Sequence, residues 1–292
     1  MQLRLCIIKY CLYIEEIARG KILLYSNGGM KIMSVIKGLE WTFDTEASRY
    51  EKMRPGYVDE LYQRIFDYVQ IDESSNVLEV GIGGGQATPP ILKTGCKLTA
   101  VEYGEQFSQI CQRKFQDYPR FSVITGRFEE FEYERNTYDL VFSASAFHWI
   151  PEEIGYSKVF SMLKSGGAFA RFANHPYKDK KREELDKEIQ KLYARYMSYS
   201  KPTDEYNEEM AAKRADIASK YGFEDISYEL FHRTRTFTSE EYVTLLGTYS
   251  DHIALEENKR VKFFAGIQRV IDDFGGQITL YDTIDLQLAR KP

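Results

Sequence analysis

A run of glycines directly after a short apolar segment is the feature that most constrains this 292-residue chain. The apolar segment is Asn76–Val80, and it passes straight into Gly81-Ile82-Gly83-Gly84-Gly85. Glycines between a strand and a helix let the backbone bend sharply and let a ligand approach it closely. In open α/β sheets, ligands bind beyond the carboxyl ends of the strands, where the strand order reverses. The run therefore predicts a ligand-binding loop that contains Gly81, Gly83 and Gly85.

Strand-like segments recur along the chain and are mostly separated by stretches with helical spacing. Those that follow the glycine run cover residues 97–101, 121–125, 138–143 and 168–173. This alternation predicts a parallel sheet with right-handed crossovers, and the unbroken apolar runs indicate strands that are buried on both faces. Two later strands, 223–231 and 278–288, are expected to add an antiparallel edge. We therefore expect a doubly wound, mostly parallel seven-stranded α/β sheet.

Two regions fall outside this pattern. Residues 1–40 are expected to be an N-terminal extension, and Met30 or Met33 are alternatives to Met1 as the translation start. The apolar part of this extension is short and interrupted by charges, which argues against a membrane span. Residues 41–292 are expected to form one domain. Within it, the charged, tyrosine-rich region 177–222 has helical spacing and is interpreted as an inserted helical cap.

Composition argues against several classes of function. The formal net charge is −5, so the chain lacks the general basic field of a nucleic-acid-binding protein. Two short basic clusters, Lys178–Arg182 and Arg233–Arg235, are interpreted as solvated surface. None of the four cysteines belongs to a C-x-x-C pair, so we expect neither a disulfide framework nor a metal site. A cytoplasmic protein with no membrane or nucleic-acid partner is the expectation.

The type of ligand follows from what the glycine run lacks. A dinucleotide fingerprint needs G-x-G-x-x-G, but the sixth position is Gln86, and a P-loop would need Gly-Lys-Ser/Thr. What remains is an acidic residue, Glu79, followed by alternating glycines. A carboxylate at this loop suits a cationic ligand such as the sulfonium of S-adenosylmethionine. Glu102 ends the second strand, where a carboxylate can accept hydrogen bonds from both ribose hydroxyls.

With these residues in view, the chain from about Trp41 resembles the class I S-adenosylmethionine-dependent methyltransferases, in the broad group of trans-aconitate methyltransferase-like enzymes. The segment 77–85 is similar to the first motif of the family, and 143–150 is similar to its small-residue then His-Trp segment. Arg127 stands where the family often has an acidic residue beside the adenine. Besides Glu79, the glycines and Glu102, the resemblance implies cofactor contacts from Tyr50, Arg54, Tyr103, Arg127, Phe128, Ser143 and Ala144.

The implied reaction is in-line transfer of the sulfonium methyl group to a nucleophile, which requires no nucleophilic side chain on the protein. His148 is the candidate general base, with packing beside Trp149 as the alternative role. Trp149, His175 and Tyr249 are candidates for the acceptor pocket. A small-molecule acceptor is favoured. A non-catalytic S-adenosylmethionine-binding protein and a nicotinamide-dependent oxidoreductase remain as alternatives.

Overall fold

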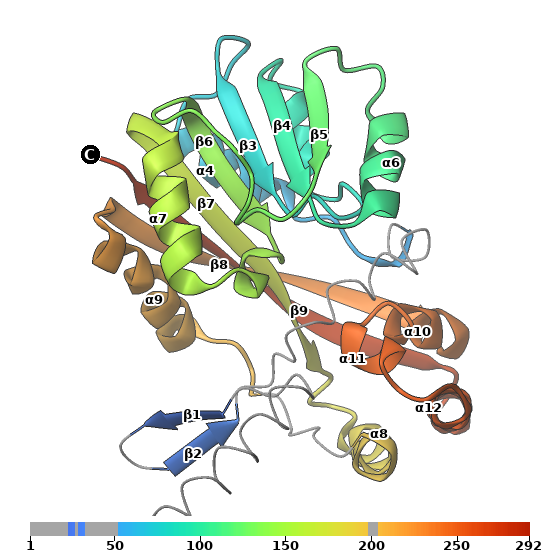
Figure 1. Cartoon of the computed structure of the whole chain (residues 1–292). Helices are drawn as coiled ribbons and strands as arrows, with labels where there is room; N and C mark the ends of the chain where they lie inside the picture. The colour runs from blue at the N-terminus through green and yellow to red at the C-terminus, as the bar shows by residue number, and fades with distance from the viewer. Residues whose placement is uncertain (1–22, 27–28, 33–51, 198–203) are drawn as a thin grey trace, which may run out of the picture.

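The computed structural model describes residues 23–26, 29–32, 52–197 and 204–292. These residues contain a seven-stranded sheet in the order β5-β4-β3-β6-β7-β9-β8 (Figure 1). Its strands are β3 (Asn76–Val80), β4 (Lys97–Glu102), β5 (Phe121–Thr125), β6 (Tyr138–Ala144), β7 (Leu163–Lys178), β8 (Glu224–Thr238) and β9 (Gln277–Arg290). The strands from β3 to β7 pair in parallel, which confirms the predicted doubly wound, mostly parallel α/β sheet.

The strand order reverses at β3. The chain first moves from β3 outward to β4 and β5, and then returns to place β6 on the other side of β3. Val77 of β3 consequently has Leu98 as its partner on one side and Leu140 as its partner on the other. The loop of glycines leaves β3 at this reversal, which is where open α/β sheets bind their ligands.

Helices cover both faces of the parallel part. Leu61 of α4 (Asp59–Tyr68) and Ile91 of α5 (Thr88–Leu92) pack in one core with Val77, and α6 (Glu105–Lys114) adds Cys111. On the opposite face, α7 (Glu152–Met162) packs in a second core with Leu78 and Val141. Successive strand side chains point to opposite faces, so Val77 and Leu78 belong to different cores. Each fully buried aliphatic side chain contributes about 1.5–3 kcal/mol to folding.

The two late strands, β9 and β8, pair in antiparallel fashion at one end of the sheet, as expected. Both β7 and β8 pair with β9 in antiparallel fashion, so β9 alone runs against the other strands, and β8 runs with them. Strand β7 is also longer than expected, because Asn174 to Lys178 continue to pair with β9. The three strands form a long ribbon beyond the parallel part (Figure 1). The far end of the ribbon carries α10 (Ser239–Leu246), α11 (Ser250–Ile253) and α12 (Glu257–Asp273).

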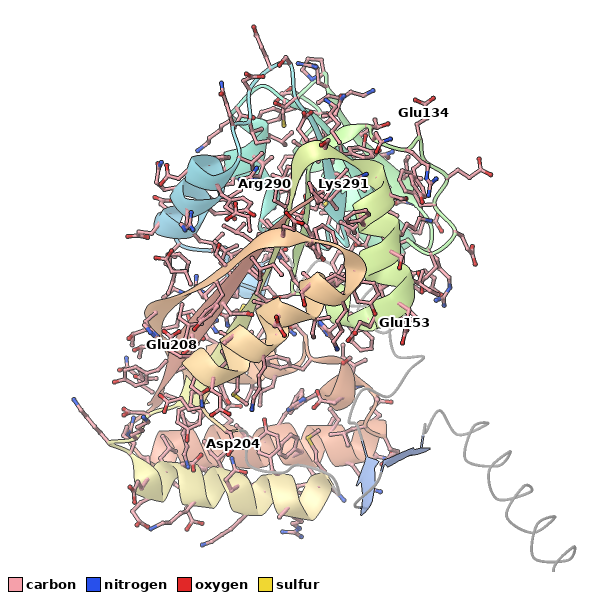
Figure 2. All side chains as sticks on the ribbon, turned by 90° about the vertical axis from the view of Figure 1, so that its left-hand side faces the viewer. Glu134, Glu153, Asp204, Glu208, Arg290 and Lys291 are labelled. Atoms are coloured by element: carbon pink, nitrogen blue, oxygen red, sulfur yellow. The ribbon has the colours of Figure 1, made fainter. Side chains whose placement is uncertain are left out.

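The region expected to form a cap contains two helices that lie apart. Helix α8 (Glu183–Tyr196) packs against α12, and α9 (Glu208–Asp216) packs against β8 and β9. Figure 2 shows Glu208 at the start of α9 on one side of the ribbon, with α8 below it, beyond Asp204. The tyrosines of α8 pack against α12: the ring centroid of Tyr193 lies 5.0 Å from that of Phe263. Neither helix lines the cavity described below, so a capping role stays a prediction.

Of the N-terminal extension, the structure describes one antiparallel hairpin, β1 (Leu23–Ser26) with β2 (Gly29–Ile32). The remainder of residues 1–40, with both Met1 and Met33, lies outside the described residues. Across the part of the chain that is described, no helix is both long and apolar enough to cross a membrane. The same part contains no group of three His, Cys, Asp or Glu side chains placed to hold a metal ion.

Candidate active site

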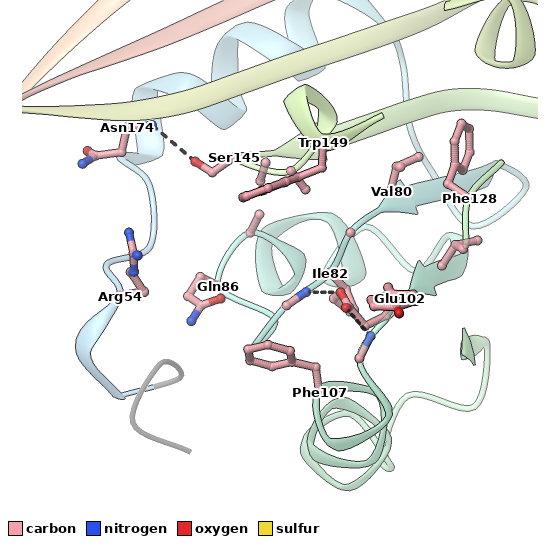
Figure 3. Close-up of a pocket in the computed structure, with 18 of the residues that line it drawn as sticks. Arg54, Val80, Ile82, Gln86, Glu102, Phe107, Phe128, Ser145, Trp149 and Asn174 are labelled. Carbon is pink, nitrogen blue, oxygen red and sulfur yellow. Dashed lines mark hydrogen bonds between the residues drawn. The ribbon is translucent and has the colours of Figure 1, made fainter. Parts of the chain in front are cut away.

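A cavity of about 240 Å³ lies at the carboxyl ends of the parallel strands (Figure 3). Its walls come from the loops that follow β3, β4, β5 and β6, and from the part of β7 that extends beyond the parallel sheet. Three distant segments complete it: the residues before α4, Arg235 of β8, and the end of α10 with the residues that follow it. The cavity therefore occupies the position that the reversal of strand order predicts.

The glycine loop forms the floor of this cavity with left-handed backbone. Gly81 and Gly83 have φ angles of 74° and 52° and line the cavity. The amide of Gly81 donates to the Val101 carbonyl at 2.8 Å, which fixes the turn. A Cβ atom on Gly81 would lie 2.4 Å from the Cβ of Ala146, so no larger residue fits. The loop therefore requires glycine at Gly81 for two separate reasons, the backbone angle and the close approach.

Gly85 was expected beside the ligand, but it packs elsewhere. It does not line the cavity, and a Cβ on it would lie 2.7 Å from the ring of Phe115 on the far side of the loop. Cys111 and Lys114 of α6 donate to the carbonyls of Gly83 and Gly84, at 3.1 and 2.9 Å. Gly85 thus allows α6 to pack closely against the loop and hold it in place.

Glu102 holds the loop from the side of β4. Its Oε2 accepts a hydrogen bond from the Gly83 amide and its Oε1 accepts one from the Gly104 amide, both at 2.8 Å (Figure 3). The side chain lines the cavity and is 8% exposed. An ionised carboxylate offers about four acceptor positions, so it can accept hydrogen bonds from several donors at once.

Glu79, expected to contact the cofactor, does not line the cavity. It shares the face of β3 that carries Val77, so its side chain is fully buried toward α5 and does not line the cavity. There its Oε2 accepts a hydrogen bond from the Thr88 hydroxyl at 2.8 Å. Burial raises the pKa of Glu79 to about 8, which keeps the carboxyl protonated at neutral pH. A neutral group in this position joins β3 to α5 and offers no negative charge to a sulfonium.

Aromatic and cationic side chains gather where β4 and β5 end. Tyr103, Arg127 and Phe128 all line the cavity, as expected. The Arg127 guanidinium lies 4.7 Å from the ring centroid of Tyr103, a cation–π arrangement. Phe128 is buried, and the Gly126 amide beside it donates to the Glu102 carbonyl at 2.8 Å.

At the opposite end, Arg54 is held by the segment after α10. Its Nε donates to the Thr248 hydroxyl and its Nη2 donates to the Thr248 carbonyl, both at 3.1 Å. Its guanidinium lies 4.0 Å from the ring centroid of Tyr249. The structure thus brings Arg54 and Tyr249 together in the cavity wall. Tyr50, the other N-terminal candidate, lies outside the described residues.

At the end of β6, the cavity wall is formed by one of the two predicted cofactor-contacting residues and by residues that follow it. Ala144 lines the cavity, but Ser143 is buried behind it and donates to the Val80 carbonyl at 2.7 Å. Ser145 has a φ of 55°, and its hydroxyl lies 2.9 Å from that of Tyr57. Sequence reasoning missed Ser145, because no sequence signal marks a left-handed serine at a strand end.

Of the expected acceptor-side residues after β6 and β7, only Trp149 lines the cavity. His148 is exposed and lies outside the cavity. His175 lies on the other face of β7 from the cavity-lining Asn174. Its Nε2 lies 2.8 Å from the Asp285 carboxylate.

Several cavity residues carried no signal in the sequence. They come from a loop, a helix and two strands, and are Gln86, Phe107, Asn174 and Arg235. Arg235 belongs to a basic cluster that the sequence analysis interpreted as solvated surface. In the structure, the side chains of Arg233 and Arg235 are 21% and 13% exposed and both pair with Asp282. The interpretation as solvated surface is therefore wrong for this cluster.

Comparison with known proteins identifies the fold and chemistry. A family model described as a methyltransferase domain matches residues 77–167, the region from β3 to the start of β7. An uncharacterised methyltransferase-like protein of Schizosaccharomyces pombe is 28% identical over 230 residues, which cover 78% of this chain and 85% of that protein. These matches identify a methyltransferase domain in the chain and support a class I S-adenosylmethionine-dependent methyltransferase. S-adenosylmethionine is accordingly its cofactor, and the nicotinamide-linked alternative is set aside.

Two further similarities involve methyltransferases with named acceptors. Malonyl-[acyl-carrier protein] O-methyltransferase 1 of Ilyobacter polytropus is 28% identical over 169 residues, 56% of this methyltransferase and 60% of that protein. Phosphoethanolamine N-methyltransferase 2 of Haemonchus contortus, solved with phosphomonomethylethanolamine and S-adenosylhomocysteine, superimposes with a TM-score of 0.51 at 18% identity. The match covers 85% of this chain and 57% of the other. This structural similarity supports the assignment of a methyltransferase-type α/β fold to the chain.

Proposed function

We propose that this enzyme transfers the sulfonium methyl group of S-adenosylmethionine to a small-molecule acceptor bound in the same cavity. The observation that carries the proposal is the cavity itself. It extends from the glycine loop and Glu102, at the strand-order reversal, to a second wall of Trp149, Asn174 and Tyr249. One cavity can therefore place a nucleoside and an acceptor side by side.

The residues at the first end fit the cofactor. Glu102 lines the cavity at the end of β4, where a carboxylate can accept hydrogen bonds from the two ribose hydroxyls. A Cβ on Gly126 would meet nothing within 4 Å, so open space adjoins the strand end where we place the adenine. Tyr103, Arg127 and Phe128 supply flat and apolar surface there. Arg127 has donors only, so it cannot accept from the adenine amino group.

We assign the methionine end of the cofactor to the glycine loop and Arg54. A guanidinium is planar and permanently charged, and it matches a carboxylate with two parallel hydrogen bonds. Thr248 and Tyr249 hold Arg54 in one orientation, so little side-chain entropy remains to be lost on binding. This pre-organisation supports a binding role for Arg54.

The chemistry asks little of the protein beyond orientation. The bound cofactor supplies a methyl group on positively charged sulfur; the acceptor–methyl bond forms as the sulfur–methyl bond breaks, and the electron pair remains on sulfur. The enclosed walls orient the acceptor in line and exclude water. His148 is exposed and lies outside the cavity, so we assign it no role as general base. An acceptor that is already ionised, or that loses its proton late, needs none.

The size of the cavity supports a small acceptor. At about 240 Å³ it lies below the usual range of ligand pockets, roughly 300–1,000 Å³, which leaves no room for a bulky acceptor beside the cofactor. The acceptors named for the similar enzymes, malonyl-[acyl-carrier protein] and phosphoethanolamine, differ chemically, so resemblance alone selects none. The cytoplasmic location expected from the sequence stays a prediction.

Calorimetric titration of the full chain with S-adenosylmethionine tests this proposal, with NADH as the competing ligand. Hydrogen bonds to a charged group contribute about 1.5–3 kcal/mol, so Glu102→Ala should weaken cofactor binding at least tenfold. Glu105→Ala is the matched control, because Glu105 is an exposed carboxylate three residues away that does not line the cavity. Tight binding of NADH with none of S-adenosylmethionine would contradict the proposal. Binding without transfer to any metabolite pool would favour the non-catalytic alternative.

A further inference from the structure

The segment that follows β5 lies directly beside Glu102. Thr125, the last residue of β5, is the register partner of Glu102 in β4. The Gly126 amide then donates to the Glu102 carbonyl at 2.8 Å. The next three residues, 127–129, all line the cavity. A base that is attached to a ribose on Glu102 therefore lies against this segment.

The first side chain of the segment cannot bind the amino group of adenine. That amino group carries two N–H donors and needs an acceptor, whereas a guanidinium has donors only. Arg127 is exposed, and its guanidinium lies 4.7 Å from the ring centroid of Tyr103, where it offers a flat surface. The acceptor for the amino group is therefore expected at another residue.

Glu129 is a carboxylate in a suitable place. Among the described residues that line the cavity, Glu102 and Glu129 carry the only carboxylates. Glu129 is half-buried, and its carboxylate makes no hydrogen bond or ion pair with any residue in 52–197 or 204–292. Removing such a group from water is costly unless a donor meets it. Its acceptor positions are therefore available to a ligand in the cavity.

Helix α7 fixes the backbone that carries Glu129. The Lys158 ammonium donates to the Glu129 carbonyl at 2.9 Å, and it lies 5.4 Å from the ring centroid of Phe128. The turn that contains Glu129 is closed by the Glu130 amide, which donates to the Arg127 carbonyl at 3.1 Å. Anchored backbone reduces the conformational entropy that is lost when a ligand binds.

The order of the strands separates Glu129 from the acceptor side. Strand β5 is the end strand of the sheet, and β4, β3 and β6 lie between it and β7. Asn174 belongs to β7, and Tyr249 follows α10 at the far end of the late strands. Glu129 therefore lies at the nucleoside end of the cavity, and the cofactor is its expected ligand.

We propose that the Glu129 carboxylate accepts a hydrogen bond from the amino group of adenine, and hence that this residue selects a 6-aminopurine cofactor. This inference rests on the cofactor placement in the proposed function and names a residue that determines its specificity. In hypoxanthine an oxygen replaces the amino group, so two acceptors would face each other with no hydrogen between them. A site that is built to bind an N–H group strongly rejects an analogue that lacks it.

Calorimetry with two ligands tests the inference. Full-length wild type, Glu129→Gln and Glu130→Gln are titrated with S-adenosylhomocysteine and with S-inosylhomocysteine, its deaminated analogue. Glu130 is the matched control, because it is the adjacent, exposed glutamate and does not line the cavity. We expect wild type and Glu130→Gln to bind S-adenosylhomocysteine about tenfold more tightly or better, the factor typical of a hydrogen bond to a charged group.

The preference should nearly disappear in Glu129→Gln. A glutamine amide can accept from an amino group through its oxygen or donate to a carbonyl through its nitrogen, so the two affinities should agree within about threefold. S-adenosylhomocysteine should bind more weakly than to wild type, and S-inosylhomocysteine should bind no more weakly. This exchange of preference is not expected from a general loss of stability, which would weaken both ligands alike.

Other outcomes overturn the inference. Equal binding of the two ligands by wild type would show that the amino group is not recognised. A preference that persists in Glu129→Gln would assign the recognition to another group. Equal weakening of both ligands in Glu129→Gln would give Glu129 a role other than base selection. Failure of wild type to bind S-adenosylhomocysteine at all is a distinct result, which removes the proposed function and this inference with it.

A second measurement covers the case in which Glu129→Gln does not fold. A crystal structure of wild type with S-adenosylhomocysteine should place the adenine amino nitrogen about 2.7–3.2 Å from a carboxylate oxygen of Glu129. An amino nitrogen that faces solvent, or that contacts only backbone carbonyls, would contradict the inference.

Discussion

Replacing Gly81 with alanine tests how the glycine loop is built. Gly81 has a φ of 74°, and the new Cβ would lie 2.4 Å from the Cβ of Ala146. A methyl group in left-handed backbone costs about 1–2 kcal/mol. Ala146 cannot rotate its Cβ away, so the backbone of one segment must shift, and such overpacking costs about 1–3 kcal/mol. Together these terms predict a loss of about 2–5 kcal/mol in the free energy of unfolding.

Two variants separate the contributions. Gly95 has a φ of 80°, but a Cβ there would meet its nearest neighbour, the Cβ of Glu73, at 3.5 Å, so Gly95→Ala should cost only the backbone term of about 1–2 kcal/mol. Changing Ala146 to glycine removes the clashing atom. In that background, Gly81→Ala should also cost only the backbone term, which a double-mutant cycle detects as a coupling of about 1–3 kcal/mol.

Urea unfolding of the four variants and wild type, followed by circular dichroism, measures these free energies. Calorimetry with S-adenosylmethionine then asks whether Gly81→Ala also weakens binding, as expected if the loop contacts the cofactor. The reasoning is refuted if Gly81→Ala destabilises no more than Gly95→Ala, or if the Ala146→Gly background does not relieve it. Either result would mean that the loop is not packed against the segment after β6.

Three further predictions concern single side chains. The folded-state pKa of Glu79 is raised, so the native state binds the proton more tightly and the free energy of unfolding of wild type declines as pH rises from about 4.5 to 8. In urea unfolding at pH 5 and pH 8, Glu79→Gln should lack that decline. The same decline in Glu79→Gln as in wild type would contradict the raised pKa. Arg127→Ala should weaken S-adenosylmethionine binding about two- to fivefold in calorimetry, which corresponds to the free energy of an exposed cation–π contact. An unchanged Kd would show that Arg127 does not contribute to cofactor binding. His148→Gln should keep kcat within about threefold and leave the pH–rate profile between pH 6 and 8 unchanged, since a general base normally contributes about 10²–10⁴-fold; a hundredfold loss would restore His148 as the base.

The parallel half of the fold could be predicted from the sequence, because its strands are unbroken apolar runs bounded by glycine or charge. Segment 121–125 was predicted at the observed bounds of β5, and 97–101 ends one residue before β4 does. The length of β7 could not be predicted in this way. Residues Asn174 to Lys178 are polar or contain proline, and they are extended only because β9 pairs with them.

The residues of the candidate site also divide into those that could be predicted from the sequence and those that could not. The position of Glu102 could be predicted, because a residue at the carboxyl end of a parallel strand lies at the same edge of the sheet as the glycine loop after the neighbouring strand. Glu79 was misplaced, because an acidic residue before glycines does not reveal which face of the strand it occupies. Arg235 was missed because its partner Asp282 lies 47 residues away in the chain. Pairing between distant strands creates such sites, and local sequence pattern does not record it.

A crystal structure of the enzyme with S-adenosylhomocysteine tests the central claim most directly. The account predicts both ribose hydroxyls within hydrogen-bonding distance of the Glu102 carboxylate, and the adenine between Arg127 and Phe128. Electron density for the nucleoside at any other place, or with its ribose turned away from Glu102, would contradict it.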